Sequence, residues 1–204
     1  MKNKLKISVI VPIFNREKYI GRCIRSLMNQ SIERNFFEII TIDDASTDAS
    51  SKILKSYSDE IKIYTNKKNK GLSASLNLGI KKANGKYIVR VDSDDYVNKD
   101  FLQILYLYIN HNQNADAVAC DYFTVDNKEK ILSRENCLKK PIGCGIIFRK
   151  SQIKKIGLYN KNFRINEEKD LMKRFVKKYI LERIALPLYR YKRHKNSLTK
   201  GVSI

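Results

Sequence analysis

The sequence contains no tryptophan, only 3 prolines and 8 glycines in 204 residues, and no uncharged apolar run near the roughly 18 residues of a membrane-spanning helix. Scarce glycine and proline exclude collagen-like and low-complexity chains. The 43% of hydrophobic residues, with 12 tyrosines and 8 phenylalanines, exclude a wholly disordered chain. Residues 1–14 have a basic start and an apolar run, but charge returns at residues 16–18 and no small-residue cleavage site follows. We therefore interpret this segment as a strand and not as a signal peptide.

Cysteine is also scarce. The four cysteines, Cys23, Cys120, Cys137 and Cys144, are too few and too scattered for a disulfide framework, and no C-x-x-C pair is present to hold zinc. We expect free thiols in a reducing compartment, which predicts a cytoplasmic protein.

Acidic residues are outnumbered, with 21 Asp and Glu against 41 Lys and Arg and a net charge of +20. The excess is concentrated in residues 128–204, which hold 22 basic and 6 acidic residues. Such an asymmetry predicts a polyanionic neighbour for this part: nucleic acid, an anionic membrane surface or a phosphorylated substrate. Solvated lysine faces are the alternative interpretation.

Hydrophobic spacing predicts an alternation of strands and helices. Short, β-branched apolar runs predict strands at residues 6–14, 36–42, 61–64, 86–91 and 115–120, and helical spacing occupies residues 17–29, 53–57, 72–83, 101–110 and 167–179. Residues 139–149 suggest a loop that enters a strand, and residues 187–204 a basic, aromatic tail. Strand–helix–strand alternation predicts an α/β fold with a mostly parallel sheet flanked by helices. Without an internal repeat or a Gly/Ser linker, we expect a single domain.

Acidic and polar residues follow three of these strands, at residues 14–15, 43–44 and 92–95. Ligands of parallel sheets bind at the carboxyl ends of the strands, so these clusters should share one edge. Asp92 and Asp94 offer oxygen ligands of the kind that Mg²⁺ or Mn²⁺ prefers. The same residues could instead cap the helix that follows, and a D-x-D sequence alone is a weak signal.

Asp43 and Asp44 have the same ambiguity, because Ser46, Thr47 or Asp48 could simply cap the next helix. Two adjacent acids exceed the need of a cap, and Asp44 could accept a nucleotide base N–H while Phe14 stacks on the ring. Neither G-x-x-x-x-G-K-[ST] nor G-x-G-x-x-G occurs, which argues against the commonest ATPase and dinucleotide sites.

Four segments in this order resemble family 2 glycosyltransferases with the GT-A fold. They are ISVIVPIFNREKYIGRCIRSLMNQS from residue 7, IDDASTDAS from residue 42, NKGLSASLNLGI from residue 69 and ANGKYIVRVDSDD from residue 83. Weaker similarity continues through IIFRKSQIKKIGLYNKNF, EEKDLMKRF and YKRHKNSLT, so that it covers nearly the whole chain. The resemblance implies a Rossmann-like GT-A domain over residues 1–204, with a nucleotide-sugar-binding half at 1–127 and a basic acceptor-binding half at 128–204.

The resemblance also implies roles for particular residues. It assigns nucleotide binding to Pro12, Phe14, Asn15, Asp43, Asp44 and Asp92. It assigns metal binding to Asp94, Asp92 and His194. Glu168 is the expected catalytic base, with Glu167 beside it. The family often has Glu-Asp where this chain has Glu167-Glu168, and Asp170 is a competing base. An Arg of the family's A-R-N sequence is missing at Leu76.

The implied function is inverting transfer of a sugar from a nucleotide sugar, expected to be a UDP-sugar, to a hydroxyl of a glycan or lipid-linked acceptor in cell-surface polysaccharide synthesis. The expected cofactor is Mn²⁺ or Mg²⁺. We expect a cytoplasmic enzyme that lies against the anionic inner face of the cell membrane, with a partner subunit or a second copy as a further possibility. The alternatives are a nucleic-acid-binding module, against which the acidic clusters argue, a nucleotidyltransferase, and an inactive or partner-dependent GT-A domain.

Overall fold

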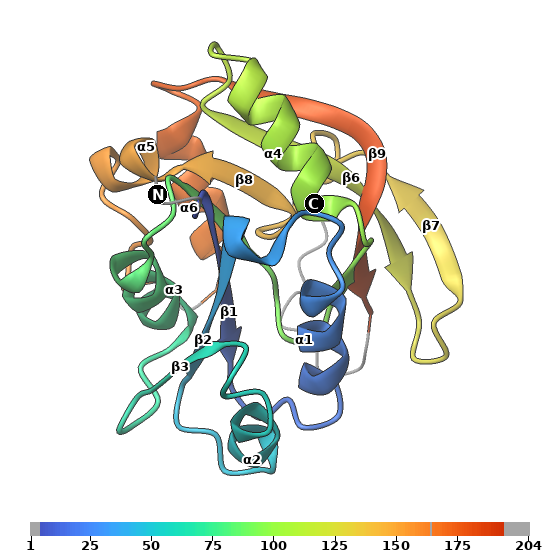
Figure 1. The fold of residues 1–204 in the computed structure, drawn as a ribbon. Helices are drawn as coiled ribbons and strands as arrows, with labels where there is room; N and C mark the ends of the chain where they lie inside the picture. The colour runs from blue at the N-terminus through green and yellow to red at the C-terminus, as the bar shows by residue number, and fades with distance from the viewer. Residues whose placement is uncertain (1–4, 164, 194–204) are drawn as a thin grey trace.

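A computed structural model describes residues 5–163 and 165–193, and in this part of the chain nine strands form one sheet (Figure 1). The strands are β1 (Ile7–Ile13), β2 (Phe37–Asp43), β3 (Lys62–Thr65), β4 (Tyr87–Arg90), β5 (Tyr96–Val97), β6 (Ala117–Val125), β7 (Ile131–Glu135), β8 (Ile146–Arg149) and β9 (Leu181–Lys192). The helices are α1 (Ile20–Met28), α2 (Ser50–Lys55), α3 (Leu72–Lys82), α4 (Phe101–His111), α5 (Lys150–Lys155) and α6 (Glu167–Phe175), with a 3₁₀ turn at Arg34–Phe36.

The first four long strands form the parallel half of the sheet. Their order is β3-β2-β1-β4, and every pairing in it is parallel. All seven residues of β1 (ISVIVPI) are buried, because helices cover both faces of this strand. The predicted α/β fold is confirmed, and each of these strands lies within one or two residues of its predicted bounds.

The second half of the sheet is mixed. β8 runs antiparallel to both β4 and β6, β7 is antiparallel to β6, and β9 pairs parallel with β6 and antiparallel with β5. The prediction of a tail beginning at residue 187 is wrong for residues 187–192, which form the end of β9. The bulky side chains of Leu188 and Tyr189 are buried there against the sheet, which a count of charges does not reveal.

Helices pack on both faces of the sheet. α1, α2 and α4 bury apolar side chains with one face of β1, through Val9 and Val11, while α3, α5 and α6 pack with Ile10 on the other (Figure 1). The alternation of Val9, Ile10 and Val11 between two clusters is the period of a strand. Among the helices of the described ranges, none has the length and apolar character needed to cross a membrane.

A buried polar network holds the amino ends of the strands together. The Glu38 carboxylate of β2 accepts hydrogen bonds from Ser8 Oγ (2.6 Å), Lys62 Nζ (2.7 Å) and the Asn84 backbone N–H (2.7 Å). Burial alone would raise the pKa of Glu38, but these donors lower it below its ordinary value. The network therefore stabilises the fold while Glu38 is ionised.

This network predicts a pH-dependent stability difference for Glu38→Gln. We expect the variant to lose about 1–3 kcal/mol of unfolding free energy at pH 7, because charge-assisted hydrogen bonds are lost. Since the folded-state pKa is depressed, the stabilisation is complete above the unfolded value of about 4.3 and disappears as the pH falls through the folded value. Urea denaturation at neutral and acidic pH measures this. Glu60→Gln, at an exposed ion pair with Arg34, is the control; a Glu38→Gln loss of equal size at both pH values would contradict the account.

Candidate active site

A cavity of about 800 Å³ lies at the carboxyl ends of β1, β2 and β4. Of the residues singled out from the sequence, those that line it are Pro12, Phe14, Asp44, Asp92, Asp94, Glu167 and Glu168. The expected convergence of polar residues from separate strand ends is thus present in the structure. His194 lies outside the described residues.

Asp44 is buried at the base of the cavity and organises the loop before α3. Its carboxylate accepts hydrogen bonds from Asn66 Nδ2 (2.7 Å) and from the backbone N–H groups of Lys70 (2.9 Å) and Gly71 (2.8 Å). Gly71 has φ +85°, a left-handed conformation that glycine adopts at no steric cost. Asp44 therefore fixes the 69–71 loop as one wall of the cavity.

Asn15 and Asp43 lie behind the cavity wall rather than on it. The Asp43 carboxylate accepts hydrogen bonds from the Ser46 N–H (3.0 Å) and Ser51 Oγ (2.7 Å). Asn15 Oδ1 accepts from the Thr47 N–H (2.8 Å), and Asn15 itself has φ +53°, which asparagine tolerates well. Both residues shape the turns that carry Phe14 and Asp44.

A buried arginine joins the end of β4 to α6. Arg90 donates to both carboxylate oxygens of Asp92, from Nε (2.6 Å) and Nη2 (3.1 Å), and from Nη1 to Glu167 Oε1 (3.1 Å). Arg90 was not among the site residues predicted from the sequence. The signal was one charged side chain inside the otherwise apolar run YIVRV.

Three carboxylates follow β4 closely. Asp95 is buried, accepts hydrogen bonds from Tyr189 Oη and the Lys192 N–H (each 2.8 Å), and anchors this segment to β9. Burial and the nearby charges of Asp94 and Asp92 raise the pKa of Asp95. Asp94 lines the cavity, with one carboxylate oxygen 3.4 Å from Arg16 Nε.

Two of these carboxylates and a thiol lie close enough together to share one divalent cation. One ligand atom from each of Asp92, Asp95 and Cys144 lies within 4.8 Å of the others. Burial, and then Asp92 and Asp95, raise the pKa of the Cys144 thiol well above its ordinary value, so that the sulfur stays protonated. Carboxylate oxygens are the ligands that remain, and these are what Mg²⁺ and Mn²⁺ take. All four cysteines are free thiols, as predicted.

The first turn of α6 presents the candidate bases. Glu167 is buried against Arg90, and burial raises its pKa, an effect that Arg90 opposes and Glu168 reinforces. Glu168 lines the cavity and has no ion pair within residues 5–163 and 165–193, whereas Asp170 is paired with Arg174 and lines a different cavity. A Cβ on Gly143 would lie 2.9 Å from Glu168 Cβ and 2.8 Å from Arg90 Nη1, so only glycine fits there.

Lys192 is a second cavity residue that the sequence analysis did not single out. It is only 5% exposed, lies 3.2 Å from Glu129 through its ammonium group, and lines the cavity from β9. Burial lowers its pKa, and Arg22 lowers it further. The basic composition of residues 187–204 indicated a solvated tail, but β9 buries this lysine.

Comparisons with known proteins give one family. The model described as "Glycosyl transferase family 2" matches residues 8–179. Glycosyltransferase GlyA of Streptococcus pneumoniae is 38% identical over 126 residues, which are 61% of this chain and 18% of that protein. Poly(ribitol-phosphate) beta-glucosyltransferase of Bacillus spizizenii is 40% identical over 114 residues, 54% of this chain and 18% of that one. The matched segments are thus a small part of these relatives.

The fold is shared with a solved structure. The crystal structure of S. aureus TarS 1-349 in complex with UDP-GlcNAc has a TM-score of 0.81 at 24% sequence identity, covering 98% of this chain and 62% of that one. At this identity the likeness establishes the fold.

The contacts of Asp44 predict a local loosening in Asp44→Asn. An asparagine amide replaces one acceptor oxygen by a donor, so at least one of the backbone N–H groups of Lys70 and Gly71 loses its partner. We expect faster hydrogen exchange of both amides, measured by mass spectrometry or NMR. Asp48→Asn, in which Asp48 accepts from the Glu17 and Ser50 N–H groups outside the cavity, is the control. Equal protection of residues 70 and 71 in both variants would show that Asp44 does not hold the loop.

Proposed function

The chain belongs to glycosyl transferase family 2, and we propose that it transfers a sugar from a UDP-sugar to a hydroxyl group of a cell-surface glycan or lipid-linked acceptor. One observation carries the proposal: acids from two strand ends, Asp44 and Asp94, share a single cavity with Glu168 of α6. Such a cavity can hold a nucleotide, a cation and a base side by side.

The nucleoside would bind between Phe14, Pro12 and Asp44. Phe14 is 43% exposed at the cavity, a face on which a base can stack. An ionised carboxylate has about four acceptor positions, and Asp44 uses three of them, which leaves one for a base N–H. UDP as the nucleotide is supported by the bound UDP-GlcNAc of the structurally similar TarS.

The diphosphate would bind beside Asp94. We propose that Asp94, Asp92 and His194 hold Mn²⁺ or Mg²⁺ there. A divalent cation, when bound there, supplies Lewis-acid stabilisation of the charge on the leaving diphosphate. Arg16 and Lys192 line the same cavity and add positive charge from the protein. The Arg90 guanidinium already spans both oxygens of Asp92, so Asp94 is the main proposed ligand.

Glu168 would act as the base. Its carboxylate takes the proton of the acceptor hydroxyl while that oxygen forms a bond to the anomeric carbon and the bond from this carbon to the diphosphate breaks. Attack opposite the leaving group inverts the anomeric configuration. Glu167 is held by Arg90, so its part is to position the start of α6.

Residues 128–204, the basic second half, would bind the acceptor. Their excess of positive charge favours an anionic acceptor. One relative, named as a poly(ribitol-phosphate) beta-glucosyltransferase, supports this chemistry. We propose that the enzyme acts at the cytoplasmic face of a membrane, where its lysines would meet anionic lipid. A partner subunit or second copy stays a prediction. The acids lining the cavity disfavour the nucleic-acid-binding alternative.

A panel of nucleotide sugars with Mn²⁺ tests the proposed function. A ligand that binds the folded state raises the melting temperature, so a UDP-sugar should raise it more than the matching GDP-sugar or the free sugar. The same mixtures should release UDP. If no UDP-sugar raises the melting temperature and none releases UDP, the proposed donor is refuted.

Replacing Glu168 by Gln should separate binding from chemistry. We expect transfer to fall by about 10²–10⁴-fold, because the base is lost, while the affinity for UDP with Mn²⁺ is retained. Turnover and calorimetric binding measure the two quantities. Glu182→Gln on β9, outside the cavity, is the matched control. Intact transfer in Glu168→Gln, with loss in Asp170→Asn, would assign the base to Asp170 instead.

A further inference from the structure

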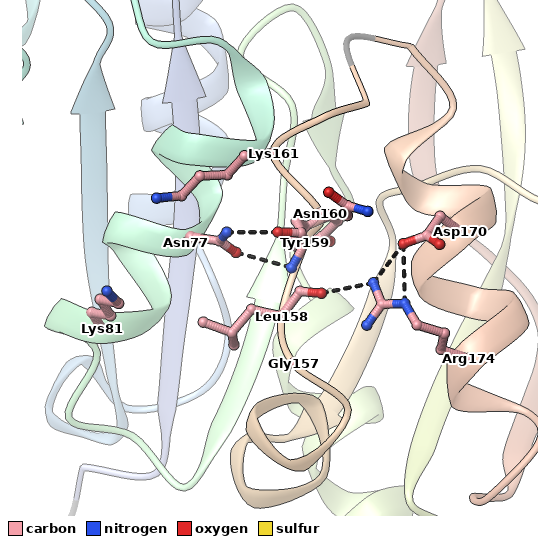
Figure 2. A pocket seen from close by; sticks show the side chains of 9 residues that line it. All are labelled: Asn77, Lys81, Gly157, Leu158, Tyr159, Asn160, Lys161, Asp170 and Arg174. Atoms are coloured by element: carbon pink, nitrogen blue, oxygen red, sulfur yellow. Dashed lines mark hydrogen bonds and ion pairs between the residues drawn. The ribbon is translucent and has the colours of Figure 1, made fainter.

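A second cavity, of about 570 Å³, lies between α3 and α6 (Figure 2). Its wall is the chain from Gly157 to Lys161, and its two sides are formed by Asn77 and Lys81 of α3 and by Asp170 and Arg174 of α6. Of these residues, only Lys161 also lines the first cavity, which we call the donor cavity.

The 157–161 wall of this second cavity is fixed by hydrogen bonds. Asn77 donates from Nδ2 to the Tyr159 carbonyl (2.8 Å) and accepts at Oδ1 from the Tyr159 N–H (3.0 Å), which joins the 157–161 segment to α3 (Figure 2). On the other side Arg174 donates to the Leu158 carbonyl (2.8 Å). The middle of the segment is thereby tied to both α3 and α6.

The only acid among the described lining residues is already neutralised. Asp170 accepts two hydrogen bonds from Arg174, at 3.0 Å from Nε and 2.6 Å from Nη2. Two further N–H groups of Arg174 donate to the carbonyls of Leu158 and Ile156, so that four of its five donors are engaged. Neither side chain is therefore available to balance another charge.

Two amines remain on the opposite side. Lys81 follows Asn77 by four residues on α3, hence on the same helix face, and the Lys161 side chain extends over α3 beside Asn77 (Figure 2). Within residues 5–163 and 165–193, no ion pair or hydrogen bond is found for either amine. Two such charges around a pre-formed hollow favour an anionic ligand.

Phosphate suits this site better than carboxylate. A lysine ammonium binds phosphate as a point charge, whereas carboxylate recognition favours a bidentate guanidinium, and the Arg174 guanidinium is already engaged. Lys161 lies on the border between the two cavities, and α6 presents Glu168 to one cavity and Asp170 to the other. A chain whose hydroxyl reaches Glu168 can therefore place its neighbouring unit over the second cavity.

We propose that this second cavity is a subsite for a phosphate group of the acceptor chain, one unit away from the hydroxyl that receives the sugar. The inference rests on the proposed function, because it extends the acceptor from Glu168. It makes the acceptor a phosphodiester-linked polymer rather than a neutral glycan.

Equilibrium binding of a synthetic phosphodiester-linked glycerol oligomer tests the proposal, with saturating UDP and Mn²⁺ to fill the donor cavity. A neutral glycerol oligomer of the same length is the matched ligand. We expect the wild-type protein to bind the phosphodiester oligomer in a salt-dependent way and the neutral one at least about fivefold more weakly. Lys81→Gln should weaken phosphodiester binding roughly fivefold, the effect of a moderately exposed charge contact.

Lys82→Gln is the control for Lys81→Gln, because it removes the same charge from the next residue of α3 without touching either cavity. The proposal would be overturned if Lys81→Gln weakens phosphodiester binding no more than Lys82→Gln does. It would also be overturned if the wild-type protein binds the neutral and the phosphodiester oligomer with equal affinity. Inorganic phosphate that competes as well as the oligomer would reduce the site to one for free phosphate, which also contradicts it. UDP release from the sugar donor is measured in a parallel assay. If no UDP is released but oligomer binding still depends on Lys81, the proposed function is refuted and the phosphate subsite is retained.

Discussion

The cavity depends on one buried cation, the Arg90 guanidinium at the end of β4. It holds Asp92 with two hydrogen bonds and Glu167 with a third, so one side chain joins the acidic segment after the sheet to the first turn of α6. Burial of a charge is costly unless it is paired, and here each partner compensates the other. Removing Arg90 would leave the carboxylates of Asp92 and Glu167 without their counter-charge. The relative position of Asp94 and Glu168 therefore follows from this arginine.

The rest of the site is built from the carboxyl edge of the parallel half of the sheet. Each loop at this edge is tied to its neighbour by a side-chain acceptor: Asn15 to the turn at Thr47, and Asp44 to the loop at Gly71. Carboxylates here serve two purposes. Some hold backbone N–H groups and make the walls rigid, and others are left at the cavity. A rigid, polar wall needs no reorganisation when a charged donor binds.

The parallel half could be predicted because its strands are continuous apolar runs and its helices have clear spacing. From that, the shared edge of Asp44 and Asp94 followed. The sequence could not show that Asn15 and Asp43 lie behind the cavity wall. A polar residue that binds backbone N–H groups of a turn and one that faces a ligand occupy the same kind of position after a strand. β9 could not be predicted either: Lys192 and Arg190 read as solvated charge, yet they lie on a strand whose partner, β6, is distant in sequence. Arg90 was the one visible clue that was not used.

The claim that Asp94 and a divalent cation together bind the diphosphate is tested most directly by calorimetric titration of UDP, with Mn²⁺ and then with excess EDTA. The account predicts that Mn²⁺ tightens UDP binding by about tenfold or more in the wild-type protein, and that Asp94→Asn abolishes this gain. Equal UDP affinity with and without the cation, or an undiminished metal effect in the variant, would contradict it.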